Sequence, residues 1–324
     1  VPVKAEIQGK FEEPSKKPRS VFWYAGILAL VVLSVFAVSY FTGLDASTPA
    51  VESEKILANS IAVLPLINLN KNGDLDYFSD GVTQEIIDEL AQINSIVVSA
   101  FSTTYHYKNI GMQPAEIAKE LGVKYLIAGS SRIFNDDNRI RLSIELIDPL
   151  TNERLWNSTF DEELSDAPSI QLAIAKKVAE NLNIELTVAE KNDLNKPITT
   201  DGEAFRLFLH AKAEINKLNM DGFKNGQRYL EEALKLDPNF SQAHTLLAWR
   251  YAVGASPDLT PGIISSQESA ALVTPFIEKA LELDPKSSDA HLIRANMRLY
   301  SLNKIQDAKK DVDLAVSLNS WPQI

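Results

Sequence analysis

Cysteine is absent from all 324 residues. Structural disulfides and thiolate metal sites are therefore excluded, while the redox compartment stays undecided. The sequence also lacks a GxxxxGK[ST] phosphate loop, a GxSxG nucleophile elbow and an HExxH zinc motif. We predict that these residues are not an enzyme and bind no metal and no cofactor. A catalytic domain further upstream stays open.

Positive charge is the scarcer sign, with 32 Lys and Arg against 43 Asp and Glu and a net charge of −11. The N-terminal residues 1–20 run against this trend, with five basic and three acidic side chains. Their basic residues are Lys4, Lys10, Lys16, Lys17 and Arg19. The acidic remainder repels phosphate backbones, so no nucleic-acid partner is predicted within this chain.

Residues 21–42 contain no charged side chain. A helix of this length spans about 33 Å, enough for a hydrocarbon core of about 30 Å, and aromatic residues stand near both ends. A buried core helix and a cleaved signal peptide are the alternatives. The run has no polar face and exceeds the apolar region of a signal peptide. The sequence therefore predicts one transmembrane helix, with the lipid bilayer as a partner.

The basic flank predicts the orientation of this helix. Residues 1–20 would be cytoplasmic, and 43–324 would lie outside, which in a bacterium means an inner-membrane protein with a periplasmic body. Ala25 and Ala29 form a small-xxx-small pair that is compatible with a homodimer. The first residue is Val1, and we expect the chain to be part of a longer protein.

After a linker at 43–60, the hydrophobic pattern of residues 61–187 predicts an α/β domain with the order β-α-β-α-β-β-β-α. The expected elements are a strand at 60–69 interrupted by Pro65, helices at 81–93, 114–121 and 168–185, and strands at 95–102, 123–134, 139–148 and 154–160. Residues 139–148 alternate apolar and polar side chains, so one face of the sheet is expected to be wet.

From 203 to 324 the pattern is helical and repeats. Residues 233–244 match 280–291 at an offset of 47, and a shorter third copy begins at 315. With an insertion around 253–270 removed, the period is near 34, and the pattern resembles tetratricopeptide repeats. This resemblance predicts an all-α solenoid that binds a protein or peptide. The expected packing residues are Ala233, Pro238, Ala248, Tyr251, Ala280 and Pro285.

An acidic stretch at 74–80 suggests a calcium loop or a carboxylate site. Counting from Asp74, however, positions 5 and 6 are Phe78 and Ser79, where an EF-hand needs a ligand and a glycine. We expect instead that Asp80 is the N-cap of the helix at 81–93 and that Tyr77 and Phe78 anchor the loop over the sheet edge.

The remaining candidates for chemistry have simpler explanations. His244 and His291 are separated by the repeat offset, so they are expected to occupy equivalent packing positions. His106 could bind a ligand or sense pH, but an isolated surface histidine explains it as well. Ser130 and Ser131 stand within an apolar strand, and we expect close packing at Gly129 and no nucleophile.

Several of these segments together resemble a known family. "SIAVLPLINL", "DYFSDGVTQEIIDEL", "LGVKYLIAGSSR" and "RIRLSIELIDPLTNERLW" are similar to the TolB amino-terminal-like (FlgO-type) domain. Residues 61–165 carry the resemblance, with departures at Leu66, Ala128 and Asn152. The motif positions are Tyr77, Phe78, Ser79, Asp80, Gly81, Gly122, Gly129 and Trp156. The resemblance implies no catalytic residue.

Proteins of this build resemble membrane-anchored, CadC-like bacterial regulators. The resemblance implies a sensing and scaffold protein, the sensory part of a one-component transcription regulator whose DNA-binding domain lies outside this chain. Two alternatives stay open: the accessory region of an adenylate or guanylate cyclase, and a repeat-based envelope assembly protein.

Overall fold

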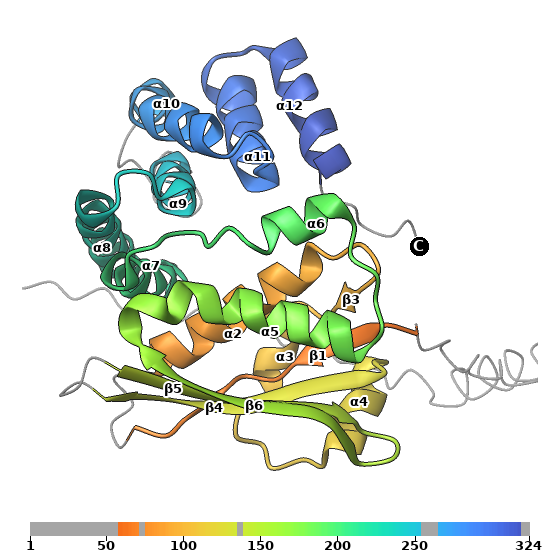
Figure 1. The fold of residues 1–324 in the computed structure, drawn as a ribbon. Helices are drawn as coiled ribbons and strands as arrows, with labels where there is room; N and C mark the ends of the chain where they lie inside the picture. Colours follow the sequence, from red (N-terminus) through yellow and green to blue (C-terminus); the bar gives the residue numbers. More distant parts are fainter. Residues whose placement is uncertain (1–57, 71–74, 135–138, 254–264, 319–324) are drawn as a thin grey trace, which may run out of the picture. The chain divides into compact units, whose positions relative to one another are not determined.

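The computed structural model describes residues 58–70, 75–134, 139–253 and 265–318. A six-stranded sheet has the order β3-β1-β4-β5-β6, with β2 paired to β4 (Figure 1). The strands are β1 Ser60–Val63, β2 Ile67–Asn68, β3 Val97–Val98, β4 Tyr125–Phe134, β5 Arg139–Asp148 and β6 Glu153–Glu163. The three strands β1, β2 and β3 make parallel pairs, whereas β4, β5 and β6 are antiparallel.

The two faces of this sheet differ, as the alternation in β5 predicts. One face is covered by α2 (Asp76–Ala91) and α5 (Ala167–Asn181), as Figure 1 shows. The apolar residues of β5 on this face are almost fully buried: Ile140, Leu142, Ile144 and Leu146. On the other face, α4 (Pro114–Leu121) packs Ile117 against Ala62 and Leu126.

Several boundaries differ from the prediction. The expected first strand is two short strands, because Pro65 separates them and the backbone N–H of Leu66 donates to Thr83 Oγ1 (3.0 Å). The expected strand at 95–102 shrinks to β3, after which the chain enters α3 (Phe101–Thr104) and the 3₁₀ turn Tyr105–Tyr107. The helix predicted at 114–121 is confirmed, and Gly122 ends it with φ 64°.

The predicted fold class is wrong in the order of its elements. The order observed up to α5 is β-β-α-β-α-α-β-β-β-α. Over the ranges that the structure covers, no helix is long and apolar enough to span a lipid bilayer. The transmembrane helix predicted at 21–42 falls outside those ranges. The observed architecture is a mixed α/β sheet followed by stacked helices.

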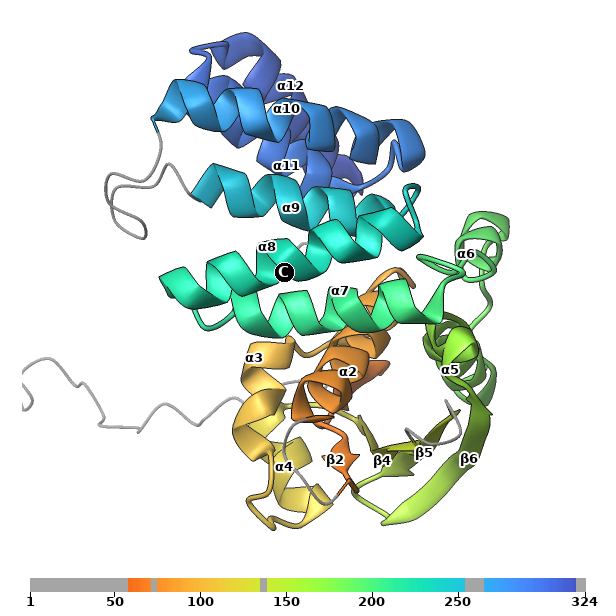
Figure 2. The ribbon, with the colours of Figure 1, turned by 90° about the vertical axis from the view of Figure 1, so that its left-hand side faces the viewer.

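Helices fill the chain beyond α5. They are α6 Val188–Asp193, α7 Gly202–Ile215, α8 Met220–Leu236, α9 Ser241–Val253, α10 Ser266–Leu283, α11 Ser288–Asn296 and α12 Ile305–Leu318, with a π-helical turn Met297–Ser301 before α12. From α7 onward, consecutive helices pack side by side (Figure 2). Four-residue turns join α7 to α8, α8 to α9 and α10 to α11, so these neighbours run antiparallel.

The sequence repeat recurs in the hydrogen bonds of these helices. Ser241 Oγ at the start of α9 donates to the carbonyl of Ala280 (3.0 Å). Ser288 Oγ at the start of α11 donates in the same way to the carbonyl of Ala315 (3.1 Å). The donors are 47 residues apart and the acceptors 35 apart, as in the sequence copies. The pairs α9–α10 and α11–α12 are therefore structurally equivalent hairpins.

Helix α7 joins the stacked helices to the sheet. It packs on α2 and α5, and a single buried hydrophobic cluster extends from the sheet through α2 to α7, α8 and α9. Phe78 and Ile86 on α2 belong to this cluster together with Phe205 and Leu209 on α7. The sheet and the first helices after it therefore share one core.

Candidate functional site

Asp80 lies inside α2 and does not cap it. The helix begins at Asp76, its N-cap residue is Leu75, and no side chain caps it. The carboxylate of Asp80 instead accepts two hydrogen bonds from Lys108 Nζ (2.7 and 2.8 Å), and Asp76 Oδ2 lies 3.7 Å from the same ammonium. Burial raises the pKa of Asp80, and Lys108 opposes that rise. The predicted N-cap is wrong, because the helix begins one turn earlier than predicted.

The residues beside Asp80 connect α2 to the sheet. Phe78 is buried in the core, and Ser79 Oγ lies 2.5 Å from Ser131 Oγ on β4. One turn later, Thr83 Oγ1 donates to the carbonyl of Ser79 (2.7 Å) and accepts from the backbone N–H of Leu66. These hydroxyls satisfy each other in a buried place, so they are structural and leave no free nucleophile.

Gly81 and Tyr77 connect the same helix to α7. A Cβ at Gly81 would come within 3.0 Å of the Leu209 side chain, so the two helices approach closely here. The Tyr77 hydroxyl accepts from Arg206 Nη1 (3.1 Å). The Tyr77 ring stacks on His210 of α7, with centroids 4.2 Å apart.

The stack continues into α8, because His210 also stacks on Tyr229 (4.1 Å). Burial lowers the pKa of His210, and Glu214, on the same helix, partly opposes this. The imidazole is therefore neutral at pH 7, and its ring links α2 to α8.

A buried ion pair crosses the same contact one turn further along α2. Lys212 Nζ on α7 lies 2.6 Å from Glu85 Oε1 and 3.7 Å from Asp88 Oδ2. Burial alone would lower the pKa of Lys212, but Glu85 and Asp88 outweigh it and raise the pKa. The charged pair therefore persists at neutral pH. We refer to the contacts of Tyr77, Gly81 and Glu85 with α7 as the α2–α7 seam.

Glu89 completes this acidic side of α2. Its side chain is buried and accepts a hydrogen bond from Gln92 Nε2 at 3.4 Å. Burial, followed by the negative charges of Glu85, Asp88 and Asp193, raises the pKa of Glu89 to about 8. Glu89 is therefore mostly protonated at neutral pH. Sequence reasoning missed it, because helical periodicity shows only that a residue faces inward.

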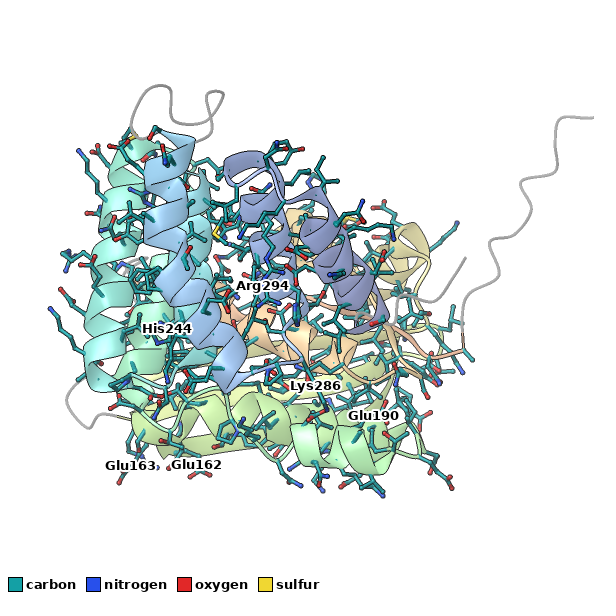
Figure 3. The ribbon with its side chains drawn as sticks, turned by 90° about the horizontal axis from the view of Figure 1, so that it is seen from above. Glu162, Glu163, Glu190, His244, Lys286 and Arg294 are labelled. Atoms are coloured by element: carbon teal, nitrogen blue, oxygen red, sulfur yellow. The ribbon has the colours of Figure 1, made fainter. Side chains whose placement is uncertain are left out.

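Helix α6 is tied to the end of α2. Glu190 Oε1 accepts from the backbone N–H of Asn94 (2.9 Å), and Oε2 accepts from the backbone N–H of Thr187 (2.7 Å) as part of a capping box. Lys286, in the turn before α11, lies 3.5 Å from Asp193 of α6. Figure 3 labels Glu190 and Lys286. These contacts hold the connection between the α/β part and the stacked helices.

His244 and His291, which occupy equivalent positions in the repeat, make the same hydrogen bond through Nε2 but differ at Nδ1. Nε2 of His244 donates to the carbonyl of Pro238 (2.9 Å), and Nε2 of His291 donates to the carbonyl of Pro285 (3.0 Å). His244 Nδ1 is buried without a hydrogen-bond partner among the described residues. His291 Nδ1, in contrast, lies 3.4 Å from Asp311 Oδ1.

Asp311 is the centre of an ion network in the last hairpin. Arg294 Nη2 and Arg298 Nη1 donate to its carboxylate at 2.7 and 2.6 Å. Burial alone would raise the pKa of Asp311, but the arginines outweigh it and lower the pKa. Figure 3 labels Arg294 and His244, which lie on α11 and α9. The matching positions of the preceding hairpin hold Leu247, Tyr251 and Phe276.

The other residues of the predicted motifs pack within the fold. A Cβ at Gly129 would meet the carbonyl of Ser143, which confirms close packing there. Trp156 pairs with Leu146 across β5 and β6 and packs on the core. Ala233, Ala248 and Ala280 are buried between helices. Tyr251 stacks on Phe276 with centroids 5.7 Å apart.

Groups of metal-ligating side chains and hollows in the surface are the other places where a ligand could bind. In the part of the chain that the structure covers, no three His, Cys, Asp or Glu side chains are arranged to hold a metal ion. One hollow of about 270 Å³ lies at the start of α7, and another of about 540 Å³ lies between α5 and α6. The second is lined by Lys176, Ala179, Glu180, Ile184, Glu185, Leu186, Lys191 and Asn195. Lys176 is already bound to Asn195 (2.7 Å).

Comparison with known proteins indicates the class of the α/β part. Residues 57–177 match the family model of the HilA/YgeH-like transcriptional regulator, second domain. The α/β part is therefore similar to the second domain of HilA/YgeH-like transcriptional regulators. The match ends within α5, so it lends no support to the tetratricopeptide assignment of the later helices.

A curated relative and two solved structures resemble parts of the chain. "Putative adenylate cyclase 3" from Rhizobium meliloti (strain 1021) is 30% identical over 221 residues, which cover 65% of this chain and 37% of that protein. TolB from Acinetobacter baumannii is 16% identical, with a TM-score of 0.28, over 38% of this chain and 28% of that one. A PelC dodecamer from Paraburkholderia phytofirmans is 17% identical, with the same TM-score, over 40% and 91%.

Proposed function

We propose that residues 58–318 receive a signal and bind a protein partner within a bacterial transcription regulator, without enzymatic activity of their own. DNA binding would be supplied by another part of the same protein. The match of residues 57–177 to a regulator domain supports the class. The α2–α7 seam is the observation that supports a coupling role.

The seam gives the proposal its mechanism. Helix α2 contacts β4 through Ser79 and α7 through Tyr77 and Glu85. A partner that shifts α7 would therefore have to break the Lys212 ion pair or carry α2 with it. Packed interfaces of this kind have discrete arrangements, which suits a two-state signal. The stacked helices beyond α7 offer the partner an extended surface.

The decisive experiment is chromatin immunoprecipitation with the full-length gene product. We expect a small set of enriched DNA fragments, and a change in transcription of the adjacent genes when the gene is deleted. The double variant Lys212→Met with Glu85→Met, which removes the ion pair without leaving a buried charge unpaired, should alter transcription as the deletion does while the protein still accumulates. The matched control is Lys177→Met, since Lys177 pairs only with Glu180 on the exposed side of α5.

A second candidate function follows from the relative in Rhizobium meliloti, which is named as an adenylate cyclase. In this alternative, the residues described here would serve as the accessory region of a nucleotide cyclase. The same full-length protein, purified and supplied with ATP, distinguishes the two. Cyclic AMP formation without enriched DNA fragments would reject the regulator and favour the cyclase.

The predicted periplasmic location stays a prediction, and the proposed coupling does not depend on it.

A further inference from the structure

The two edges of the sheet are unlike each other. At one edge, β3 has two residues, and the chain soon turns into α3. At the other edge, β6 has eleven residues and forms the margin of the sheet, as Figure 2 shows. A long open edge presents a row of unpaired backbone N–H and C=O groups, so natural sheets usually keep their edge strands short or covered. By this rule β3 is an ordinary edge strand, and β6 is not.

In the described ranges, the backbone of β6 pairs only with β5. A bulge at Leu155 interrupts the pairing near its start, and from Trp156 to Glu163 the register is regular. Between described residues, no backbone–backbone hydrogen bond of 153–163 leaves this pair of strands. Alternate residues of a strand point their N–H and C=O groups to opposite edges, so about half of these residues have them on the open side. The edge can therefore accept one further strand.

The middle of β6 lacks the charges that commonly protect an edge strand. Residues 155–160 carry no charged side chain and include leucine, tryptophan, threonine and phenylalanine, most of which favour strands. Trp156 and Phe160 pair with buried residues of β5, whereas Asn157 and Thr159 are exposed on the other face. A strand added at this edge therefore matches β6 when it alternates apolar and polar side chains.

The ends of β6 are acidic, since the strand carries four acids and a single arginine. Arg154 is paired with Glu145 (2.7 Å), and two arginines of the inner strand β5 are both directed to Asp161. The acids that have no ion pair within the described ranges are Glu153, Glu162 and Glu163. Figure 3 shows Glu162 and Glu163 at the margin of the molecule. Lysine or arginine near the ends of an added strand complements these charges.

We propose that the outer edge of β6 binds an extended, basic segment of a partner protein as an additional strand of the sheet. Backbone hydrogen bonds supply the affinity of this contact, and the acids at the strand ends supply its selectivity. A second copy of the chain fits less well. When two β6 strands pair about Ser158, Glu153 of each copy faces Glu163 of the other, so like charges meet twice. The contact lies on the sheet and does not depend on the proposed role in transcription.

The direct test is the binding of a fluorescent peptide to the 324-residue chain. The peptide alternates valine and threonine, has lysine at both ends and is as long as β6. One added strand buries less than a standard interface of about 1,600 Å², so we expect a dissociation constant on the order of 10 to 100 µM by fluorescence anisotropy. The same peptide with glutamate at both ends should bind at least about tenfold more weakly. No binding, or equal binding of the two peptides, would overturn the proposal.

Backbone methylation distinguishes an added strand from binding through side chains alone. Two further lysine-ended peptides carry N-methyl groups, one on every valine amide and the other on every threonine amide. A strand presents only alternate N–H groups to one neighbour. One methylated peptide should therefore lose binding, and the other should bind like the unmethylated peptide. An equal effect of both methylation patterns would contradict strand addition.

Charge reversal on the protein locates the site. The triple variant Glu153→Lys, Glu162→Lys and Glu163→Lys should prefer the glutamate-ended peptide, with unchanged circular dichroism because all three side chains are exposed. The matched control reverses three exposed acids of the stacked helices, Glu231→Lys, Glu282→Lys and Asp313→Lys. It has the same net charge and should keep the preference for lysine. If both variants change the preference alike, the peptide responds only to net charge and the proposal is wrong.

Hydrogen exchange provides a measurement that needs no substitution. The lysine-ended peptide should slow amide exchange within residues 153–163, because amides on the open side of β6 become hydrogen-bonded. Exchange in α8, α10 and α12 should stay as it is without the peptide. Protection of these helices with no change in β6 would place the peptide elsewhere and overturn the proposal.

Discussion

Two buried ion networks in this protein mirror each other. At the α2–α7 seam, the acids Glu85 and Asp88 lie beside a single cation, Lys212, and the buried acid Glu89 follows them on α2. In the last hairpin, the cations Arg294 and Arg298, with His291, surround a single acid, Asp311. The more numerous charged groups, acids on α2 and arginines in the hairpin, differ in whether a change of protonation can remove their charge. An acid can take up a proton, as Glu89 does, whereas arginine keeps its charge.

This difference teaches where pH sensitivity can arise. After burial, the negative charges of Glu85 and Asp88 contribute to raising the pKa of Glu89 to about 8, so negative charge on this side of α2 is relieved by protonation near neutral pH. Excess positive charge in the hairpin has no such outlet, because Arg294 and Arg298 are held by hydrogen bonds to an ionised carboxylate. Protonation near neutral pH is therefore expected on α2 and not among the arginines of the hairpin.

The largest expected effect is at the seam. Lys212→Met removes the cation and leaves Glu85 buried and unpaired, which should lower the free energy of unfolding by about 4 kcal/mol. Urea denaturation at pH 7 measures it. If the double variant Lys212→Met with Glu85→Met is as unstable as the single variant, the unpaired charge is not the cause.

A similar but smaller loss is expected in the hairpin. Asp311→Ala leaves Arg294 and Arg298 without their carboxylate, at a cost of about 3 kcal/mol, because both arginines are partly exposed and can turn to water. Urea denaturation again applies, with Asp307→Ala on the exposed side of α12 as the control. An equal effect of the two substitutions would show that the network contributes little.

The pH dependence separates the two networks. The pKa of Glu89 is about 8 in the folded protein, above the ordinary glutamate value of 4.5. The folded form therefore holds a proton that the unfolded chain loses, and stability falls as pH rises from about 4.5 to 8. Each pKa unit is worth about 1.4 kcal/mol, so Glu89→Gln should stabilise by at least about 2 kcal/mol at pH 8 and by nothing at pH 4.

Asp311 has the opposite sign, which provides the control. Its pKa is lowered in the folded protein, so its stabilisation is present above the unfolded pKa and is lost as pH falls through the folded value. Asp311→Asn should therefore flatten the acid limb of the stability curve and leave the limb between pH 5 and 8, roughly, unchanged. A change in the neutral limb would show that the two networks are not independent.

The smallest effect concerns how closely the seam is packed. Gly81→Ala places a methyl group 3.0 Å from the Leu209 side chain, and the helices must separate slightly. We expect a loss of about 1 kcal/mol, measured by thermal unfolding. In a Leu209→Ala background, Gly81→Ala should cost less than it does in the unaltered protein if the contact is responsible. An equal cost in both backgrounds would point to a different cause.

Local patterns predicted much of this architecture. The period-two alternation of residues 139–148 gave the covered face of the sheet, because only one face of an antiparallel sheet was available for packing. Pro114 and Gly122 marked the ends of α4 through their own backbone preferences. The twelve-residue repeat indicated equivalent hairpins, which the paired hydrogen bonds of Ser241 and Ser288 now show.

Non-local contacts explain where prediction failed. Aspartate is a residue type that commonly caps helices, but α2 begins one turn before Asp80. In that turn Tyr77 stacks on His210, and Ser79 Oγ contacts Ser131 Oγ. The partners of Tyr77 and Ser79 lie 133 and 52 residues away along the chain, and periodicity carries no information at that distance. Lys212 and Glu85 are likewise ordinary helical positions until α2 and α7 come together.

The sequence alone determined which residues are buried, where several helices begin and end, and that two hairpins are equivalent, because these follow from local propensity and from repetition within the chain. Only the tertiary structure decided which charges become partners. A charged side chain has the same helix propensity with or without a partner. Packing decides this, since burial removes the water that would otherwise screen the charge.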